Sequence, residues 1–132
     1  MQSVAKKKIL FVDDNQSVLV AGKLLIKSLG HEIILADSGE KAIEIIRECP
    51  YKIEIIFLDL TMPGIGGVGV LKFMRKRRIK IPIIVQTGVT CLKEFKKTYG
   101  MDIVGCLEKP YTKEDMAKLI DCAIIRETAS SS

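Results

Sequence analysis

The sequence predicts an α/β domain in which a parallel sheet of five strands is covered by helices on both faces. Short apolar runs alternate with segments of helical period along the chain, which is the pattern of repeated βα units. Apolar residues make up 48% of the sequence and aromatic residues 5%, and Trp is absent. The core must therefore consist mainly of Ile, Leu and Val, as in a buried parallel sheet. A chain of 132 residues is expected to form one domain.

The first two units each pair an extended apolar run with an amphipathic helix. Strands are predicted at Lys8–Val12 and Glu32–Ala36. Gly30 and Pro50 end the helices that follow, because glycine favours helix carboxyl ends and proline cannot continue a helix. Apolar residues recur every three or four positions on each helix: Val18, Ala21, Leu25 and Leu29 in the first, and Ala42, Ile45 and Cys49 in the second, which opens at Ser38.

The third and fourth units surround a glycine-rich loop and a basic stretch. Ile53–Leu58 is predicted as the third strand, and after the loop a helix begins near Val70. Gly69 falls inside this helix, so we expect its first turn to fray. Pro82–Gln86 is predicted as the fourth strand. The fourth helix is expected within residues 90–99, a short lysine-rich segment with little apolar face, and we expect it to be mobile.

The fifth unit completes the domain. Its strand is predicted at about Val104–Leu107, and Thr112 with Asp115 resembles a capping box in front of the fifth helix. We expect one domain over residues 1–132 with its core at about 7–126. The tail at 127–132 is expected to be disordered.

Charge and composition exclude several function classes. The net charge is +5, and its densest cluster runs from Lys72 to Lys80. We interpret this cluster as a solvated helix end in preference to a nucleic-acid patch, because basic residues favour that position and no nucleic-acid-binding module accompanies them. The four cysteines form no C-x-x-C pair, and His31 has no nearby partner for a zinc site. The apolar run before Asp13 is too short for a signal peptide or membrane span. We therefore expect a reduced, cytoplasmic protein that binds neither nucleic acid nor membranes.

Reactive side chains follow four of the predicted strands. The first strand is followed by Asp13 and Asp14, the third by Asp59, the fourth by Thr87 and the fifth by Lys109. Each has an ordinary explanation when taken singly: an aspartate can cap the first helix, the threonine can end a strand and the lysine can be a surface charge. Together they meet at the edge of a parallel sheet where chemistry occurs. Converging carboxylates repel one another unless a cation offsets them, and such an oxygen set suits Mg²⁺.

Two other classes of site share parts of this region. Gly64 to Gly69 has the G-x-G-x-x-G spelling of a dinucleotide-binding loop, which requires glycines directly after a strand and an acid about 20 residues later. Here Asp59 to Pro63 intervene, and Ile84 to Thr87 contains no acid. A haloacid-dehalogenase-like phosphatase would need a second aspartate where Thr61 stands. We interpret the glycines as turn formers in the loop of the site.

Four segments resemble the receiver domain of two-component response regulators: ILFVDDN, FLDLTMPGIGG, VQTG and LEKPY. The resemblance extends from about Lys7 to Arg126 and includes the D-x-x-M-P-x-x-x-G run that begins at Asp59. It implies a three-layer, doubly wound, flavodoxin-like fold with five helices and the strand order 2-1-3-4-5.

The resemblance implies a metal site and a phosphoacceptor. Asp59 would take a phosphoryl group from a histidine kinase or a phosphotransfer protein. Asp13 and Asp14 would bind Mg²⁺, directly or through water, and Asp59 and the backbone carbonyl of Thr61 would complete the protein ligands.

The resemblance also implies how the modified state is held and sensed. Thr87 would donate its hydroxyl to a phosphoryl oxygen, and Lys109 would pair with the phosphate and precede Pro110 through a cis peptide bond. A downstream protein would bind through the fourth helix, fifth strand and fifth helix. The domain would not be an enzyme beyond self-phosphorylation and self-dephosphorylation.

Cys106 departs from the family pattern, which usually places Tyr or Phe three residues before the lysine. We interpret it as a small buried hydrophobe. Without an inward-swinging ring, output must use the loop after Thr87, or the switch is weak. The alternative hypothesis is an unphosphorylated receiver-like scaffold for interaction or dimerisation, although all five residues of the expected site are present.

Overall fold

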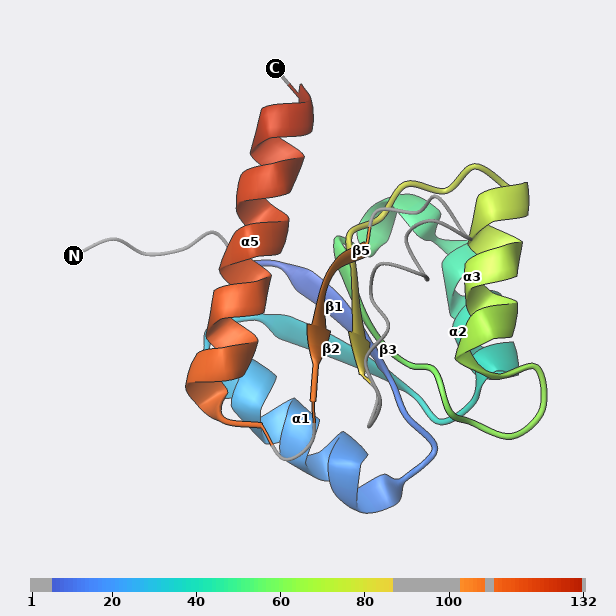
Figure 1. Ribbon diagram of the computed structural model, residues 1–132, viewed down its shortest axis with the longest axis horizontal. Coiled ribbons are helices and arrows are strands. Elements are labelled where there is room, and N and C mark those ends of the chain that lie inside the picture. Colours follow the sequence, from blue (N-terminus) through green and yellow to red (C-terminus); the bar gives the residue numbers. More distant parts are fainter. Residues whose placement is uncertain (1–5, 87–102, 109–110, 132) are drawn as a thin grey trace.

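The computed structural model describes residues 6–86, 103–108 and 111–131, which form a sheet between two layers of helices (Figure 1). The elements occur in the order β1 (Lys8–Val12), α1 (Gln16–Ser28), β2 (Glu32–Ala36), α2 (Gly39–Glu48), the 3₁₀ turn η1 (Pro50–Lys52), β3 (Ile55–Asp59), α3 (Gly66–Lys76), β4 (Ile83–Gln86), β5 (Ile103–Leu107) and α5 (Lys113–Ser131).

The sheet has five parallel strands in the order β2-β1-β3-β4-β5, as the family resemblance implied. Val12 of β1 is in register with both Ala36 of β2 and Leu58 of β3. Gln86 of β4 is in register with Asp59 of β3 and Leu107 of β5. The ends of β1, β3 and β4 are therefore aligned along one edge of the sheet.

Helices cover both faces of the sheet, with α1 and α5 on one side and α2 and α3 on the other (Figure 1). Within the described part of the chain there are four α-helices; the additional one expected at 90–99 lies outside the described residues. Because both faces are covered, every residue of β3 is buried and the strand is almost entirely apolar.

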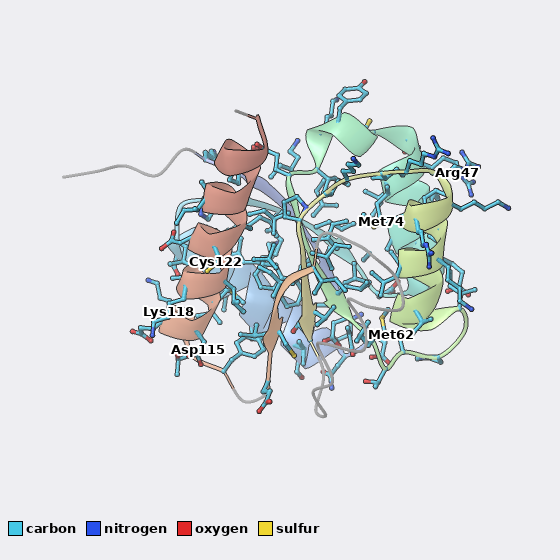
Figure 2. All side chains as sticks on the ribbon, turned by 45° about the horizontal axis from the view of Figure 1, so that its top comes forward. Arg47, Met62, Met74, Asp115, Lys118 and Cys122 are labelled. Carbon is cyan, nitrogen blue, oxygen red and sulfur yellow. The ribbon has the colours of Figure 1, made fainter. Side chains whose placement is uncertain are left out.

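Alternate strand residues fill two separate cores. On the α1 and α5 side, Phe11 and Phe57 stack with ring centroids 5.6 Å apart. On the other side, Leu58 packs with Leu71 and Met74 of α3. Figure 2 shows the side chains in these layers, with Met74 between α3 and the sheet.

The helix caps agree with the sequence signals. The Ser38 hydroxyl accepts a hydrogen bond from Lys41 N at 3.0 Å at the start of α2. Thr112 and Asp115 form the predicted capping box, in which each backbone N–H donates to the other side chain, at 2.9 and 3.1 Å.

The predicted face of α1 is confirmed in part. Three of its four residues are partly buried and pack against the core on the α1 and α5 side: Val18, Leu25 and Leu29. Ala21 is exposed, and the fully buried residues of the helix are Leu19, Gly22 and Ile26. The reason is the ring of Phe11: a Cβ added to Gly22 would lie 2.5 Å from Phe11 Cζ. The ring occupies the space that a side chain on the helix would need, so a glycine forms the centre of the contact.

Two predictions about helix ends are wrong. α3 begins at Gly66, and its first turn is closed by a 2.9 Å hydrogen bond from Gly69 N to Ile65 O, so it is not frayed. The space beside Gly69 is filled by the Ile65 side chain. α5 continues to Ser131 through residues predicted to be disordered, because no Gly or Pro follows Arg126 to stop it.

Candidate functional site

Two adjacent strands bring three carboxylates together. Asp13 and Asp14 follow β1, and Asp59 is the last residue of the neighbouring β3. Carboxylate oxygens of the three residues all lie within 4.8 Å of one another. Asp13 and Asp59 are 0% and 3% exposed, while Asp14 is exposed to solvent. The cluster therefore has a buried floor and one solvent-facing member.

Two other residues of the predicted site lie outside the described residues. Thr87 directly follows β4, and Lys109 comes two positions after β5 ends at Leu107. Their predicted roles, and the cis peptide bond predicted for Lys109 and Pro110, stay predictions.

The two aspartates that follow β1 do not cap the helix after them. Asn15 is the N-cap of α1, and its Oδ1 accepts hydrogen bonds from Ser17 N and Val18 N at 2.9 and 3.3 Å. Asp13 Oδ1 in turn accepts from Asn15 N at 2.9 Å. The explanation of Asp13 or Asp14 as the cap of the first helix is therefore wrong, because the residue after them performs that function.

The turn after β3 fixes the orientation of the third carboxylate. Asp59 Oδ1 accepts hydrogen bonds from both Thr61 N, at 2.9 Å, and Thr61 Oγ1, at 3.1 Å. Sequence reasoning gave Thr61 only a backbone role. The contribution of its hydroxyl follows from the D-x-T spacing, which allows a side chain to bond two residues onward.

The glycine-rich loop allows α3 to approach the backbone of Asp59 closely. A Cβ on Gly67 would lie 2.2 Å from the backbone oxygen of Asp59. Gly64 and Gly66 have positive φ values of 75° and 64°, a conformation that glycine adopts without strain. These glycines shape the loop, in agreement with their interpretation as turn formers.

Neither Gln86 nor Tyr111 was predicted from the sequence as a residue of the site. The Tyr111 hydroxyl donates a 3.3 Å hydrogen bond to Oε1 of Gln86, the residue in register with Asp59. Burial, with a smaller contribution from the negative charge of Asp13, raises the pKa of Tyr111 to about 12. Tyr111 therefore remains a neutral hydrogen-bond donor at physiological pH.

Cys106 lies in β5 opposite Val85 of β4. Its side chain is partly buried and packs against the core on the α2 and α3 side. Its surroundings are those of a small hydrophobic residue.

The donor set of the acidic cluster fits a hard divalent cation. Two buried carboxylates and a third nearby one repel one another in the absence of positive charge. Mg²⁺ prefers oxygen ligands and is usually bound by a few carboxylates together with water. Asp13, Asp14 and Asp59 present such oxygens at the solvent boundary, so these residues could hold Mg²⁺.

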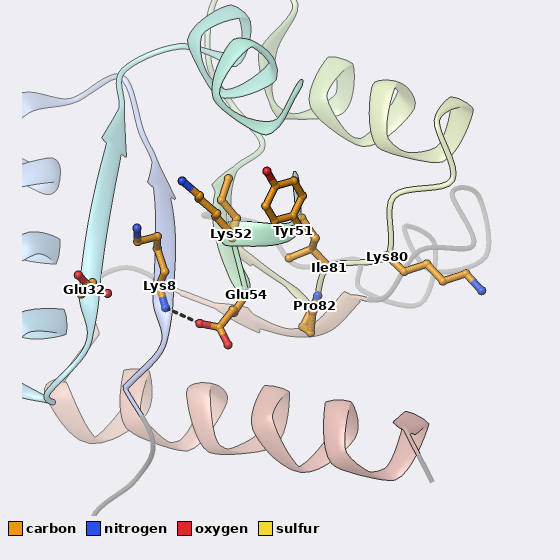
Figure 3. A pocket seen from close by; sticks show the side chains of 9 residues that line it. Lys8, Glu32, Tyr51, Lys52, Glu54, Lys80, Ile81 and Pro82 are labelled. Atoms are coloured by element: carbon orange, nitrogen blue, oxygen red, sulfur yellow. Dashed lines mark hydrogen bonds between the residues drawn. The ribbon is translucent and has the colours of Figure 1, made fainter. Parts of the chain in front are cut away.

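A pocket of about 600 Å³ lies at the opposite end of the strands (Figure 3). Lys8, Tyr51 and Lys80 are among its lining residues. The Glu54 carboxylate in this pocket accepts a 3.0 Å hydrogen bond from Lys8 N and pairs with Lys7 at 3.4 Å. Because it lies at the amino ends of the strands, this pocket is separate from the acidic cluster.

Among the described helices, none has the length and apolar character needed to cross a membrane.

Comparison with known sequences identifies a family. A family model for the response regulator receiver domain matches residues 9–121. The cell cycle response regulator CtrA of Brucella abortus is 26% identical over 121 residues, which cover 92% of this chain and 51% of the relative. The chain thus spans about half the length of the curated relatives it matches.

Solved structures agree with that family in sequence and fold. A response regulator receiver domain protein from Clostridium thermocellum matches with 28% identity and a TM-score of 0.82, covering 93% of this chain and 98% of that one. The chemotaxis protein CheY4 of Vibrio cholerae has 26% identity and a TM-score of 0.77, with coverage of 89% and 98%. The receiver domain of the hybrid histidine kinase CckA has 28% identity and a TM-score of 0.73, with coverage of 88% and 97%.

Proposed function

Because the chain belongs to the response regulator receiver domain family, we propose that it is a phosphorylation-controlled switch in which Asp59 accepts a phosphoryl group in a Mg²⁺-dependent reaction. The observation that carries this proposal is the convergence of Asp13, Asp14 and Asp59 within 4.8 Å at the ends of two adjacent strands. The phosphoryl donor is a histidine kinase or a phosphotransfer protein. Since the domain must meet such a donor, we propose that it lies in the cytoplasm.

Asp13, Asp14, Asp59 and the backbone carbonyl of Thr61 are the residues that would hold Mg²⁺. The ion, when bound, supplies positive charge that offsets the carboxylates and the incoming phosphoryl oxygens. A carboxylate is a weak nucleophile, so its orientation matters. The two hydrogen bonds from Thr61 to Oδ1 fix the plane of the Asp59 carboxylate. The new bond joins an oxygen of this carboxylate to phosphorus while the bond from phosphorus to the donor breaks.

Thr87 and Lys109 complete the proposal as contacts of the phosphoryl group. The hydroxyl of Thr87 donates to one phosphoryl oxygen, and the ammonium of Lys109 pairs with another. Charge-assisted hydrogen bonds contribute about 1.5–3 kcal/mol each, so two contribute roughly 3–6 kcal/mol. Moving a two-state element from 1:99 to 99:1 requires about 5.5 kcal/mol. The two contacts therefore reach the required free energy only at the upper end of their range.

The signal leaves the domain by a change in protein binding. We place the partner surface on the fourth helix, β5 and α5. Since Cys106 stands where the family usually has an aromatic ring, the change is carried by the backbone after Thr87. The domain acts through binding, with at most self-phosphorylation and self-dephosphorylation of its own. Whether it passes the phosphoryl group onward or docks a target depends on the rest of the pathway.

The second candidate function is an unphosphorylated interaction or dimerisation scaffold, and Cys106 favours it. Incubation with Mg²⁺ and acetyl phosphate, followed by intact mass measurement, separates the two. The switch predicts one phosphoryl adduct that disappears when Mg²⁺ is chelated. An unmodified mass, with the domain still folded, would support the scaffold.

A further inference from the structure

Gln86 is a buried amide in an otherwise apolar layer. It ends β4 and is 0% exposed. Ile84, two residues earlier on the same strand, belongs to the core on the α1 and α5 side, and Leu107 of β5 lies in register with Gln86 in that same core. An apolar residue here would pack without any polar group to satisfy, so the amide requires an explanation.

One half of the amide has a partner and the other half has none. Gln86 Oε1 accepts the hydrogen bond from the Tyr111 hydroxyl at 3.3 Å. Among the described residues, Gln86 Nε2 has no hydrogen-bond partner although it is buried. The amide nitrogen therefore donates to neither Asp13 nor Asp59 in this state. Within the described part of the chain, the two N–H groups of Nε2 are therefore desolvated without compensation.

The unsatisfied donor lies in the same row as the acidic cluster. Phe11, Phe57 and Ile84 occupy the same core, so the residues two positions onward continue that face to the carboxyl ends of the strands: Asp13, Asp59 and Gln86. Asp59 and Gln86 are direct partners in the register of β3 and β4. Neighbouring strands are about 4.8 Å apart, which is within the reach of a glutamine side chain.

Tyr111 determines which end of the amide is already engaged in a hydrogen bond. Tyr111 follows β5, on one side of Gln86, and Asp59 ends β3, on the other side. Because the hydroxyl of Tyr111 engages Oε1, the other end of the planar amide, Nε2, is left to donate to a different acceptor. Tyr111 thus acts as a positioning residue for the amide.

We propose that Gln86 is a phosphoryl-binding residue, whose Nε2 donates a hydrogen bond to a phosphoryl oxygen on Asp59, and that Tyr111 holds the amide in the orientation this requires. The inference rests on the proposed function, since it needs the phosphoryl group on Asp59. A phosphoryl oxygen accepts hydrogen bonds strongly and projects beyond the reach of the unmodified carboxylate. Phosphorylation would therefore satisfy a donor that is buried without compensation in the unmodified domain.

Beryllofluoride with Mg²⁺, a phosphoryl mimic, provides the test, with its dissociation constant measured by isothermal titration calorimetry. Gln86→Met keeps the length and shape of the side chain and removes the donor. We expect the affinity for beryllofluoride to weaken about tenfold or more, the size of a hydrogen bond to a charged acceptor. The melting temperature without beryllofluoride should be equal to or above that of the native chain.

Two further variants separate binding from packing. Tyr111→Phe removes only the hydroxyl and should weaken beryllofluoride binding about threefold. Ile84→Met introduces the same side chain one step deeper in the same core and should leave the affinity unchanged. If Gln86→Met does not fold, the beryllofluoride affinity of Tyr111→Phe alone tests the proposal.

Affinities of Gln86→Met and Tyr111→Phe within twofold of the native value would overturn the inference, even if their melting temperatures fell. A weakening equal to that of Ile84→Met would also overturn it. Native protein that binds no beryllofluoride in the presence of Mg²⁺ would instead contradict the proposed function itself. The two failures are therefore distinguishable.

Discussion

Both hydrogen-bond donors of Thr61 converge on one oxygen of Asp59: the backbone N–H at 2.9 Å and the hydroxyl at 3.1 Å, each to Oδ1. This pair of bonds fixes the plane of a carboxylate that is 3% exposed. Fixed orientation is what a weak nucleophile needs, because positioning contributes much of the rate of phosphoryl transfer.

The hydroxyl of Thr61 can be removed alone. In Thr61→Val the backbone bond persists and the side chain keeps its shape, so we expect phosphorylation by acetyl phosphate to slow about five- to tenfold, as for the loss of one hydrogen bond of about 1 kcal/mol. Thr61→Ser retains the hydroxyl and serves as the control. The rate is measured by intact mass against time. Equal rates in the valine and serine variants would show that the hydroxyl has no role.

Asp14 is the exposed member of the acidic cluster, so its replacement tests metal binding with little effect on the core. Asp14→Ala removes an oxygen ligand and one of three repelling charges. We expect Mg²⁺ affinity to fall at least about tenfold, while the melting temperature without Mg²⁺ stays the same or rises. Asp121→Ala changes an exposed aspartate on α5 and is the control. Unchanged Mg²⁺ affinity in Asp14→Ala would remove that residue from the metal site.

Gly67 permits the closest contact between α3 and the site. In Gly67→Ala the new Cβ would clash with the backbone oxygen of Asp59, so α3 or the backbone that carries Asp59 must move. We expect the free energy of unfolding to fall by about 1–3 kcal/mol or more in urea titrations, and phosphorylation to slow.

The control for this change is Gly30→Ala. Gly30 has a φ of 90° but no atom within 4 Å of an added Cβ, so its replacement costs about 1–2 kcal/mol of backbone strain only. Stability should fall while the phosphorylation rate stays native. If both variants phosphorylate at the native rate, the close approach at Gly67 does not matter for the chemistry.

His31 predicts a pH dependence of stability. It is 6% exposed, and its Nδ1 accepts a 3.0 Å hydrogen bond from Lys7 N, which requires the neutral ring. Burial lowers its pKa below the usual 6.5; the charges of Asp121 and Glu54 oppose this shift and that of Lys7 adds to it. The unfolded chain therefore binds the proton more readily. The contribution of His31 to stability is complete above pH 6.5 and is lost as the pH falls toward the folded-state pKa.

His31→Asn offers an acceptor near the position of Nδ1 and does not titrate. As the pH falls below 6.5, the native chain should lose stability relative to this variant. Urea titrations at several pH values measure the difference between their free energies of unfolding. A difference that is independent of pH would show that His31 titrates alike in the folded and unfolded chains.

The fold was predictable because its signals are local and repeated. β1 and β2 were predicted with their observed bounds, Lys8–Val12 and Glu32–Ala36, since both are apolar runs bounded by helix-stop signals or charges. The parallel arrangement then required Asp13 and Asp59 to meet. The centre of the buried face of α1 was missed because Gly22 has no side chain that could contribute to an apolar periodicity, although Phe11 packs directly on it.

Of the candidate site, only the charged residues at the strand ends were predictable from the sequence. Aspartates at strand ends are conspicuous in a sequence, whereas the hydrogen bond between Gln86 and Tyr111 joins residues 25 positions apart that resemble ordinary strand-end and loop residues. Nothing in their spacing indicates a contact. Only the register of β4 with β3 and β5 shows that the amide lies in the row of the carboxylates.

The identity of the modified residue tests the central claim most directly. After incubation with Mg²⁺ and acetyl phosphate, borohydride reduction converts an aspartyl phosphate to homoserine, and peptide mass mapping locates that residue among the 16 acidic side chains. We predict homoserine at position 59 alone, and none after incubation without Mg²⁺. Homoserine at another acidic position, or none at all in folded protein, would contradict the assignment of Asp59 as the phosphoacceptor.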